Sequence, residues 1–77
     1  MIKCSNPDKL VALIEYAFPS IRQEEPTQGK IVFRINDIIC NIFLNTGTVY
    51  FQGKTTGPNI PIMESIVEMI HFVNNEN

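Results

Sequence analysis

The segment from Lys30 to Lys54, KIVFRINDIICNIFLNTGTVYFQGK, constrains the fold most, because two short turns join three apolar-rich runs within it. Asn36-Asp37 and Thr46-Gly47 are typical of two-residue β-hairpin connections, in which Gly47 would supply a positive φ. The segment therefore predicts three antiparallel strands whose pairing can be counted outward from each turn. In this register Ile35 faces Ile38, Phe33 faces Cys40, Ile31 faces Ile42, Leu44 faces Val49, Ile42 faces Phe51 and Phe43 faces Tyr50.

Side chains alternate with a period of two along a strand, so the three strands have one apolar face and one mixed face. The apolar face is the predicted core and contains Ile31, Phe33, Ile35, Ile38, Cys40, Ile42, Leu44, Val49 and Phe51. The mixed face combines amides, aromatic rings and one charge: Val32, Arg34, Ile39, Asn41, Phe43, Asn45, Thr48, Tyr50 and Gln52. A face meant only for water usually carries more Lys, Glu and Thr. The mixed face therefore predicts a binding surface.

The flanking segments predict two helices. Asn6 can cap a helix from Pro7 to Phe18, and a second helix from Pro61 to Asn74 has an apolar arc wider than that of a usual surface helix. Part of this arc is expected to pack under the sheet, and the rest either packs in the small core or meets another subunit. A short strand over Ile2 to Cys4 and a charged edge strand over Ile21 to Glu25 are expected as well.

The length of 77 residues predicts one domain, 1–77, that buries only about 60–65% of its unfolded surface, so self-association as a homo-oligomer, most simply a dimer, is expected to add stability. No apolar run approaches the ~20 residues that cross a bilayer, and no signal-peptide pattern follows Met1. The expected location is the cytoplasm, with no membrane partner. Cys40 lies on the predicted core face and Cys4 in a strand-like run, so both are expected to be reduced, buried thiols, and their spacing fits no zinc site.

The order of elements and the hairpin CNIFLNTGTVYFQGK resemble one repeat of the TATA-box-binding protein fold. The resemblance rests on Ile42-Phe43, Asn45-Thr46-Gly47, Val49-Tyr50-Phe51 and Gly53. The N-terminal substrate-binding domain of bacterial ribonuclease HIII is similar too, matched by Phe51-Gln52-Gly53. The resemblance implies an α+β fold of order β-α-β-β-β-α, with an antiparallel sheet and both helices packed on one of its faces. It also implies that the open face binds nucleic acid and includes Asn41, Phe43, Tyr50 and Gln52, although a single repeat needs a homodimer to form a continuous saddle.

Charge and chemistry narrow the function further. The net charge is −2, and the six basic residues are scattered along the chain, which argues against a protein that holds long nucleic acids. The stretch GTVYFQGKT is one residue too long for a phosphate loop. His71 follows Glu68 by three residues and is expected to face solvent in contact with it, and no further ligands for a metal are evident. No nucleophile, base and orienting group can be assembled, so we expect a non-catalytic protein without cofactors.

The predicted function is a binding module for a nucleotide-like ligand. Phe43 and Tyr50 would stack on a base, Asn41 and Gln52 would read its edge, and Arg34 or Lys54 would meet a phosphate. Such a small binder could act by sequestration, as phage-encoded anti-defence sponges of signalling nucleotides do. Two alternatives stay open: recognition of a duplex or an RNA/DNA hybrid by a dimeric saddle, and a protein–protein interaction subunit whose sheet face and second helix are both interfaces.

Overall fold

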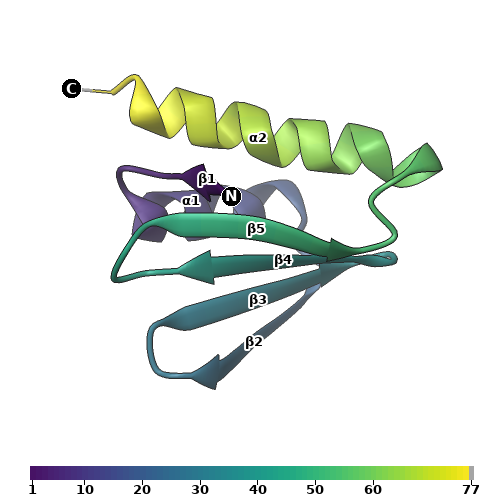
Figure 1. The fold of residues 1–77 in the computed structure, drawn as a ribbon, viewed down its shortest axis with the longest axis horizontal. Helices are drawn as coiled ribbons and strands as arrows, with labels where there is room; N and C mark the ends of the chain where they lie inside the picture. The colour runs from purple at the N-terminus through teal and green to yellow at the C-terminus, as the bar shows by residue number, and fades with distance from the viewer. Residues whose placement is uncertain (77) are drawn as a thin grey trace.

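The computed structural model describes residues 1–76 and contains one five-stranded antiparallel sheet and two α-helices (Figure 1). The strands lie in the order β1-β5-β4-β3-β2. In chain order the elements are β1 (Ile2–Lys3), α1 (Pro7–Ala17), β2 (Arg22–Thr27), β3 (Lys30–Ile35), β4 (Ile38–Phe43), β5 (Thr48–Gly53), a 3-10 turn (Gly57–Asn59) and α2 (Ile60–Asn74). The predicted α+β class with an antiparallel sheet is confirmed. The expected charged edge strand is present as β2, so four strands separate the helices and the β-α-β-β-β-α order is corrected to β-α-β-β-β-β-α.

Both helices begin and end close to their predicted positions. The side chain of Asn6 accepts a hydrogen bond from the Lys9 N–H at 3.2 Å, and Pro7 occupies the first helical position, where a missing N–H costs nothing. Before α2, the buried side chain of Asn59 donates to the Lys54 carbonyl at 2.9 Å and fixes the corner that leads from the sheet into the helix. Neither helix in residues 1–76 has the length and apolar character that crossing a membrane would require.

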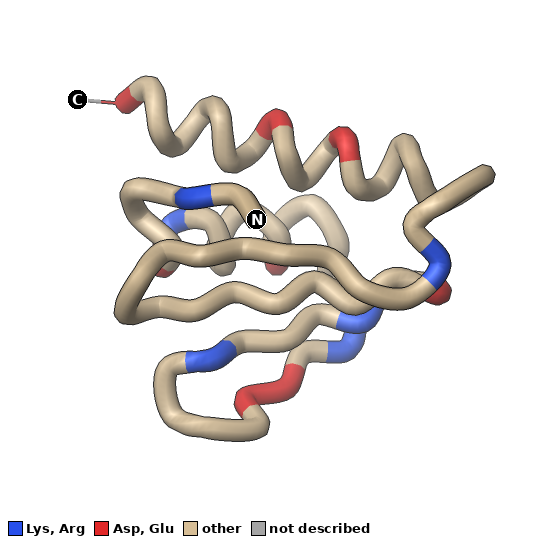
Figure 2. Tube along the Cα trace, in the orientation of Figure 1, with Lys and Arg blue, Asp and Glu red and all other residues tan. Residues whose placement is uncertain are grey.

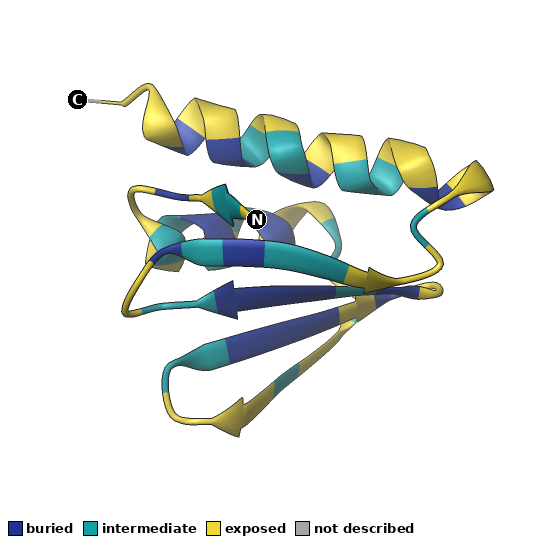
Figure 3. Ribbon diagram, in the orientation of Figure 1, coloured by how far each residue is buried: buried dark blue, intermediate teal, exposed yellow. Residues whose placement is uncertain are grey.

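The core lies on one face of the sheet, and both helices pack against that face. Leu10 and Ile14 from α1 join Ile66, Ile70 and Val73 from α2 in a single cluster with the inward side chains of the strands. Figure 3 shows the buried residues concentrated in β3, β4 and the side of α2 that faces the sheet. Seven of the nine predicted core residues of the strands are buried, and the other two, Leu44 and Phe51, are partly buried against the cluster.

Two thiols contribute to this core. Cys4 and Cys40 are both free and buried, as predicted. Burial disfavours the charged thiolate and raises the pKa of Cys40 to about 12. The thiol of Cys40 therefore serves as a small apolar packing group.

The β3–β4 hairpin has the predicted register. Ile35 pairs with Ile38, Phe33 with Cys40 and Ile31 with Ile42. The turn between the strands contains only two residues, and Asn36 takes the positive φ of 53° that such a turn demands. Local sequence alone was sufficient to align these two strands.

The β4–β5 register differs from the prediction by two residues. Ile42 pairs with Val49, not Phe51, because the connection is a four-residue loop from Leu44 to Gly47. The N–H of Gly47 closes this loop on the Phe43 carbonyl at 2.8 Å, and Gly47 does have positive φ, at 74°. The Gly47 carbonyl also accepts the Cys4 N–H at 2.7 Å. The loop is therefore fixed partly by the residue that follows β1, and the sequence of β4 and β5 alone does not reveal this contact.

The shift by two residues changes the cross-strand partners without exchanging the faces. Tyr50 lies opposite Asn41, and Gln52 lies opposite Ile39. Phe43 lies opposite Lys30 of β3 and is diagonal to Tyr50. Since the side-chain period is two, every predicted member of the mixed face within β3, β4 and β5 keeps its orientation.

Candidate functional site

The surface of the sheet opposite the two helices is the candidate site, and we call it the open face. The ladders arrange its side chains in three rows across the strands. The first row is Arg22, Arg34, Ile39 and Gln52, the second is Glu24, Val32, Asn41 and Tyr50, and the third is Lys30, Phe43, Thr48 and Lys3. Neighbouring rows are about 7 Å apart, since two residues of a strand span that distance. The open face is therefore wide enough for a ligand the size of a nucleotide.

An amide pair lies near the centre of the open face. The Asn41 Nδ2 donates to Gln52 Oε1 at 3.0 Å, and it also approaches the Tyr50 carbonyl at 3.5 Å. Asn41 is only 2% exposed, so its side chain is held in place, whereas Gln52 is exposed. Within residues 1–76 the exposed Gln52 Nε2 donor forms no hydrogen bond. It can donate to an acceptor on the edge of a planar base, while the buried Asn41 amide holds the Gln52 side chain in position.

An aromatic pair adjoins the amides. The rings of Phe43 and Tyr50 are stacked with centroids 5.9 Å apart and planes 19° apart, and both residues are half-buried. The Nζ of Lys30 lies over the Phe43 ring, 5.3 Å from its centroid, within the range of a cation–π contact. The predicted proximity of the two rings is thus present, although it arises from diagonal neighbours.

Arg34, predicted to contact either ligand or water, forms an ion pair. Its Nε donates to Glu24 Oε1 at 2.8 Å, and Arg22 Nη2 approaches the other carboxylate oxygen at 3.4 Å. The hydrogen bond from Arg34, aided by the charges of both arginines, lowers the pKa of Glu24 against a smaller effect of desolvation. Much of the positive charge of Arg34 is therefore balanced by a neighbour on β2.

Lys54, the last predicted site residue, lies just beyond β5, two residues after Gln52. Its backbone N–H donates to the Asp37 carbonyl at 2.9 Å, and its own carbonyl accepts from Asn59. The residue is exposed and makes no ion pair within the described chain. The structure thus brings Arg34, Asn41, Phe43, Tyr50 and Gln52 together on the open face and places Lys54 at its rim.

Charge is distributed unevenly between the sheet and the helices. The strands and their turns carry five of the six basic residues, Lys3, Arg22, Lys30, Arg34 and Lys54, against three acidic ones, Glu24, Glu25 and Asp37, a balance of +2. The helices and the segment after α2 carry Lys9 against Asp8, Glu15, Glu64, Glu68 and Glu76, a balance of −4. The two balances add to the net charge of −2. Figure 2 shows acidic residues along α2 and basic residues along the strands.

The expectation that only Arg34 projects from the mixed face was therefore wrong. Lys30 lies two residues before Val32 and four before Arg34, so its side chain points to the same face of β3. Extending the predicted β3–β4 register by one more pair would have placed Lys30 on the open face. Arg22 and Lys3 reach the open face through β2 and β1. The register of β2 is shifted by an irregularity between Glu24 and Thr27, and that of β1 depends on pairing with the distant β5, so neither could be counted from a turn.

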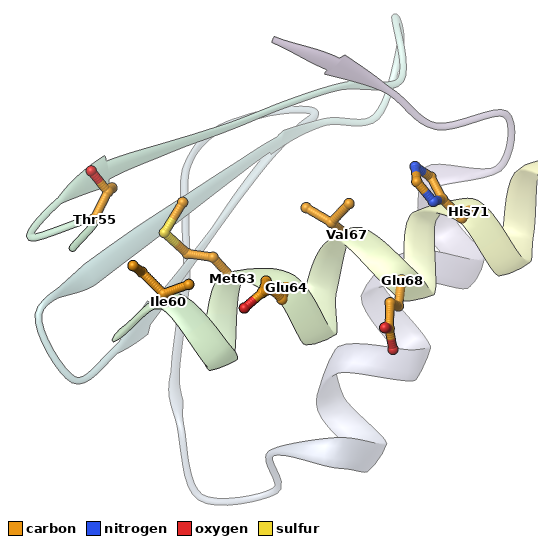
Figure 4. A pocket seen from close by; sticks show the side chains of 7 residues that line it. All are labelled: Thr55, Ile60, Met63, Glu64, Val67, Glu68 and His71. Carbon is orange, nitrogen blue, oxygen red and sulfur yellow. The ribbon is translucent and has the colours of Figure 1, made fainter. Parts of the chain in front are cut away.

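A hollow of about 400 Å³ lies on one flank of α2, away from the open face. Ile60, Met63 and Val67 line it, and Thr55 faces them from the loop after β5 (Figure 4). Figure 4 also shows the side chains of His71 and Glu68 pointing to different sides of the helix, so the predicted contact between them is not formed. His71 is exposed, as predicted. No cluster of three potential metal ligands occurs among residues 1–76.

Comparison with known proteins adds no relative. No protein-family model matches the chain, and no curated protein shows significant similarity to it. The likeness to a TATA-box-binding protein repeat stays a prediction.

Proposed function

We propose that the protein is a non-catalytic binding module that holds a nucleotide-like ligand on its open face. One observation carries the proposal: a stacked aromatic pair lies beside an amide pair whose exposed Gln52 Nε2 is free to donate, on the more basic side of the molecule. Aromatic surface binds the face of a base, amides bind its edge, and cations bind its phosphate. The open face carries all three kinds of group.

Burial and rigidity support this role for the open face. Asn41 is held by its neighbours, and both amides belong to paired strands, so little side-chain freedom would be lost when a ligand binds. The aromatic rings belong to the same two strands. Binding groups mounted on adjacent strands of a sheet keep their spacing better than groups on loops do.

We propose sequestration as the mode of action. The described side chains offer hydrogen bonds, stacking and charge on the open face, but no arranged pair of nucleophile and base, so a bound nucleotide would be held without chemical change. A protein acting in this way lowers the free concentration of its ligand in proportion to its own amount. A phage-type anti-defence sponge for signalling nucleotides is the biological setting that we propose.

Isothermal titration with mononucleotides, cyclic dinucleotides and ADP-ribose derivatives tests the proposal. We expect at least one compound to bind with a defined stoichiometry. Base stacking on an aromatic ring contributes roughly 1–3 kcal/mol, so Tyr50→Ala and Phe43→Ala should each weaken binding about tenfold. The absence of heat with every compound at millimolar concentration would contradict the proposal.

The chain offers a matched control for each aromatic variant. Tyr16 on α1 is 89% exposed and Phe72 on α2 is 57% exposed, and both lie away from the open face. Tyr16→Ala and Phe72→Ala should leave ligand affinity within about twofold of the wild type. Equal losses in the control and open-face variants would indicate a general effect of the substitutions, not a site.

A second candidate function is binding of nucleic acid, either a duplex or an RNA/DNA hybrid, by a dimeric saddle. The observation that favours it is the gathering of five basic residues on the sheet, which a count of net charge conceals. Binding through phosphates releases counterions, so affinity for a hybrid oligonucleotide should fall steeply as salt rises from 50 to about 200 mM. An affinity that does not change with salt would reject this function.

We also propose that the protein forms a homodimer through the outer side of α2. Ile60 is 44% exposed, and it continues into the apolar hollow lined by Met63 and Val67. Light scattering should then give twice the chain mass of 8.8 kDa at micromolar concentration, and Val67→Glu should halve it. If Phe43→Ala and Tyr50→Ala lowered the mass instead, the open face would be the interface and the protein would be an interaction subunit.

A further inference from the structure

The third row of the open face has features of an anion site. Lys30 pairs with Phe43, the next position after the Ile42–Val49 pair brings Phe43 beside Thr48, and Thr48 pairs with Lys3. The row therefore has a lysine at each end, with an aromatic ring and a hydroxyl group between them. None of these four residues belonged to the predicted phosphate-binding groups, which were Arg34 and Lys54.

Both lysine side chains lean toward the middle of the row. The Lys30 ammonium lies over the Phe43 ring at 5.3 Å, and the Lys3 ammonium lies 2.8 Å from the Thr48 Oγ1. Lys3 also donates to the Thr46 carbonyl at 3.3 Å. Since neighbouring strands are about 4.8 Å apart, the two charges lie on either side of the Thr48 hydroxyl. A phosphate group placed there could contact both.

The hydroxyl of Thr48 is a third polar group in this row. Its oxygen accepts from the Lys3 ammonium at 2.8 Å and lies 2.9 Å from the Thr46 hydroxyl oxygen. A threonine hydroxyl rotates freely about its C–O bond, so its proton can turn toward an anionic oxygen placed over the row.

Charge compensation distinguishes the two ends of the open face. At the end with Arg22 and Arg34, Glu24 forms ion pairs with both arginines. At the other end, neither Lys3 nor Lys30 forms an ion pair within residues 1–76. The nearby Glu25 carboxylate accepts the Gly29 N–H at 3.1 Å in the β2–β3 turn. The two arginines share one carboxylate, whereas each of the two lysines keeps its ammonium group free of any ion pair with the described residues.

We infer that this row binds the phosphate group of the ligand, with Lys3, Lys30 and the Thr48 hydroxyl as its donors. The identity of that ligand as a nucleotide rests on the proposed function. The inference fixes the direction of binding: the phosphate lies over Thr48, and the base extends past Tyr50 toward the amides of Asn41 and Gln52, one to two rows away. The ligand class is accordingly a nucleoside phosphate, not an uncharged nucleoside.

The test compares 5′-AMP with adenosine, using chemical shift changes in the NMR spectrum of the full chain. A hydrogen bond between charged groups is stronger than one between neutral groups. Lys3→Gln and Lys30→Gln should therefore each weaken 5′-AMP binding about tenfold, and Thr48→Val should weaken it about fivefold. Lys54→Gln and Arg22→Gln remove cations from the rival phosphate position at the opposite end of the open face, and each should change affinity less than threefold. Adenosine should bind more weakly than 5′-AMP and should not respond to any of these variants.

Inorganic pyrophosphate separates failure of this inference from failure of the proposed function. Saturable shifts at Lys3, Lys30 and Thr48 with pyrophosphate, without binding of any nucleotide, would uphold the anion site and overturn the nucleotide function. Nucleotide binding that Lys54→Gln or Arg22→Gln weakens more than Lys3→Gln and Lys30→Gln do would uphold the function and overturn the inference. Equal affinity for 5′-AMP and adenosine would also overturn it. No shifts with either probe would overturn both.

Discussion

Replacement of Gly47 by Ala should destabilise the protein by far more than the usual cost of a positive φ. A Cβ at this position would lie 2.3 Å from the Cys4 carbonyl oxygen, a backbone atom of the segment that follows β1. Because no real Cβ approaches backbone so closely, the segment has to move. The move breaks the 2.7 Å bond from the Cys4 N–H to the Gly47 carbonyl and exposes the Cys4 side chain, which is 4% exposed in the native protein.

These losses set the expected magnitude. The positive φ of 74° costs about 1 kcal/mol for a residue with a Cβ, the lost hydrogen bond about 1 kcal/mol, and the exposure of a small apolar side chain about 1 kcal/mol. The free energy of unfolding should therefore fall by about 3 kcal/mol, a large part of the ~4–12 kcal/mol that a chain of this length has.

Gly57 provides the control. It also has positive φ, at 61°, but an added Cβ would meet no atom within 4 Å, so Gly57→Ala should cost only about 1 kcal/mol. Urea denaturation followed by circular dichroism measures both variants, and amide exchange at Cys4 should quicken in Gly47→Ala alone. If the free energies of unfolding of the two variants differ by less than about 0.5 kcal/mol, the close approach of Cys4 to Gly47 does not destabilise Gly47→Ala as expected.

Three further predictions follow from burial and charge. Phe33 is fully buried, so Phe33→Ala should lower the free energy of unfolding by about 3–5 kcal/mol in urea denaturation, whereas Phe72→Ala at an exposed site should cost less than about 1 kcal/mol. Because Arg34 lowers the pKa of Glu24, that carboxylate favours the folded state above its unfolded pKa, and the benefit disappears as the pH falls through the lower folded value. Arg34→Gln should therefore raise the Glu24 pKa in an NMR titration, and an unchanged pKa would refute the role of the ion pair. Cys40, with a pKa of about 12, should resist a thiol reagent at pH 8 until urea unfolds the chain, and rapid labelling of the native protein at Cys40 would contradict its burial.

Much of the fold could be predicted from local sequence. The capping Asn6 with Pro7 begins α1, and the two-residue turn at Asn36-Asp37 sets the register of β3 and β4, because each feature acts over a few residues. The Thr46-Gly47 dipeptide led to a wrong register for β4 and β5, because a positive-φ glycine can close a four-residue loop as well as a two-residue turn. What fixes this loop is a bond from Cys4, forty-three residues away in the chain.

The candidate site was predicted in part for the same reason. Because side chains alternate with a period of two, a register error of two residues between β4 and β5 leaves Asn41, Phe43, Tyr50 and Gln52 on the same face. The partners of charged groups depend on which strands become neighbours. The ion pair of Arg34 with Glu24 needs β2 beside β3, and the contribution of Lys3 needs β1 beside β5.

The division of charge between sheet and helices also affects how a ligand approaches the protein. The molecule measures 33 × 27 × 24 Å, whereas the Debye length in physiological salt is about 8 Å. An anion near the sheet is thus screened from most of the carboxylates on the helices and is attracted by the lysines nearest to it. In dilute salt the screening weakens, so the net charge of −2 repels the same anion from further away. A protein with an acidic isoelectric point near 5.2 can in this way bind to an anion-exchange resin through its helices while it captures anionic ligands with its sheet.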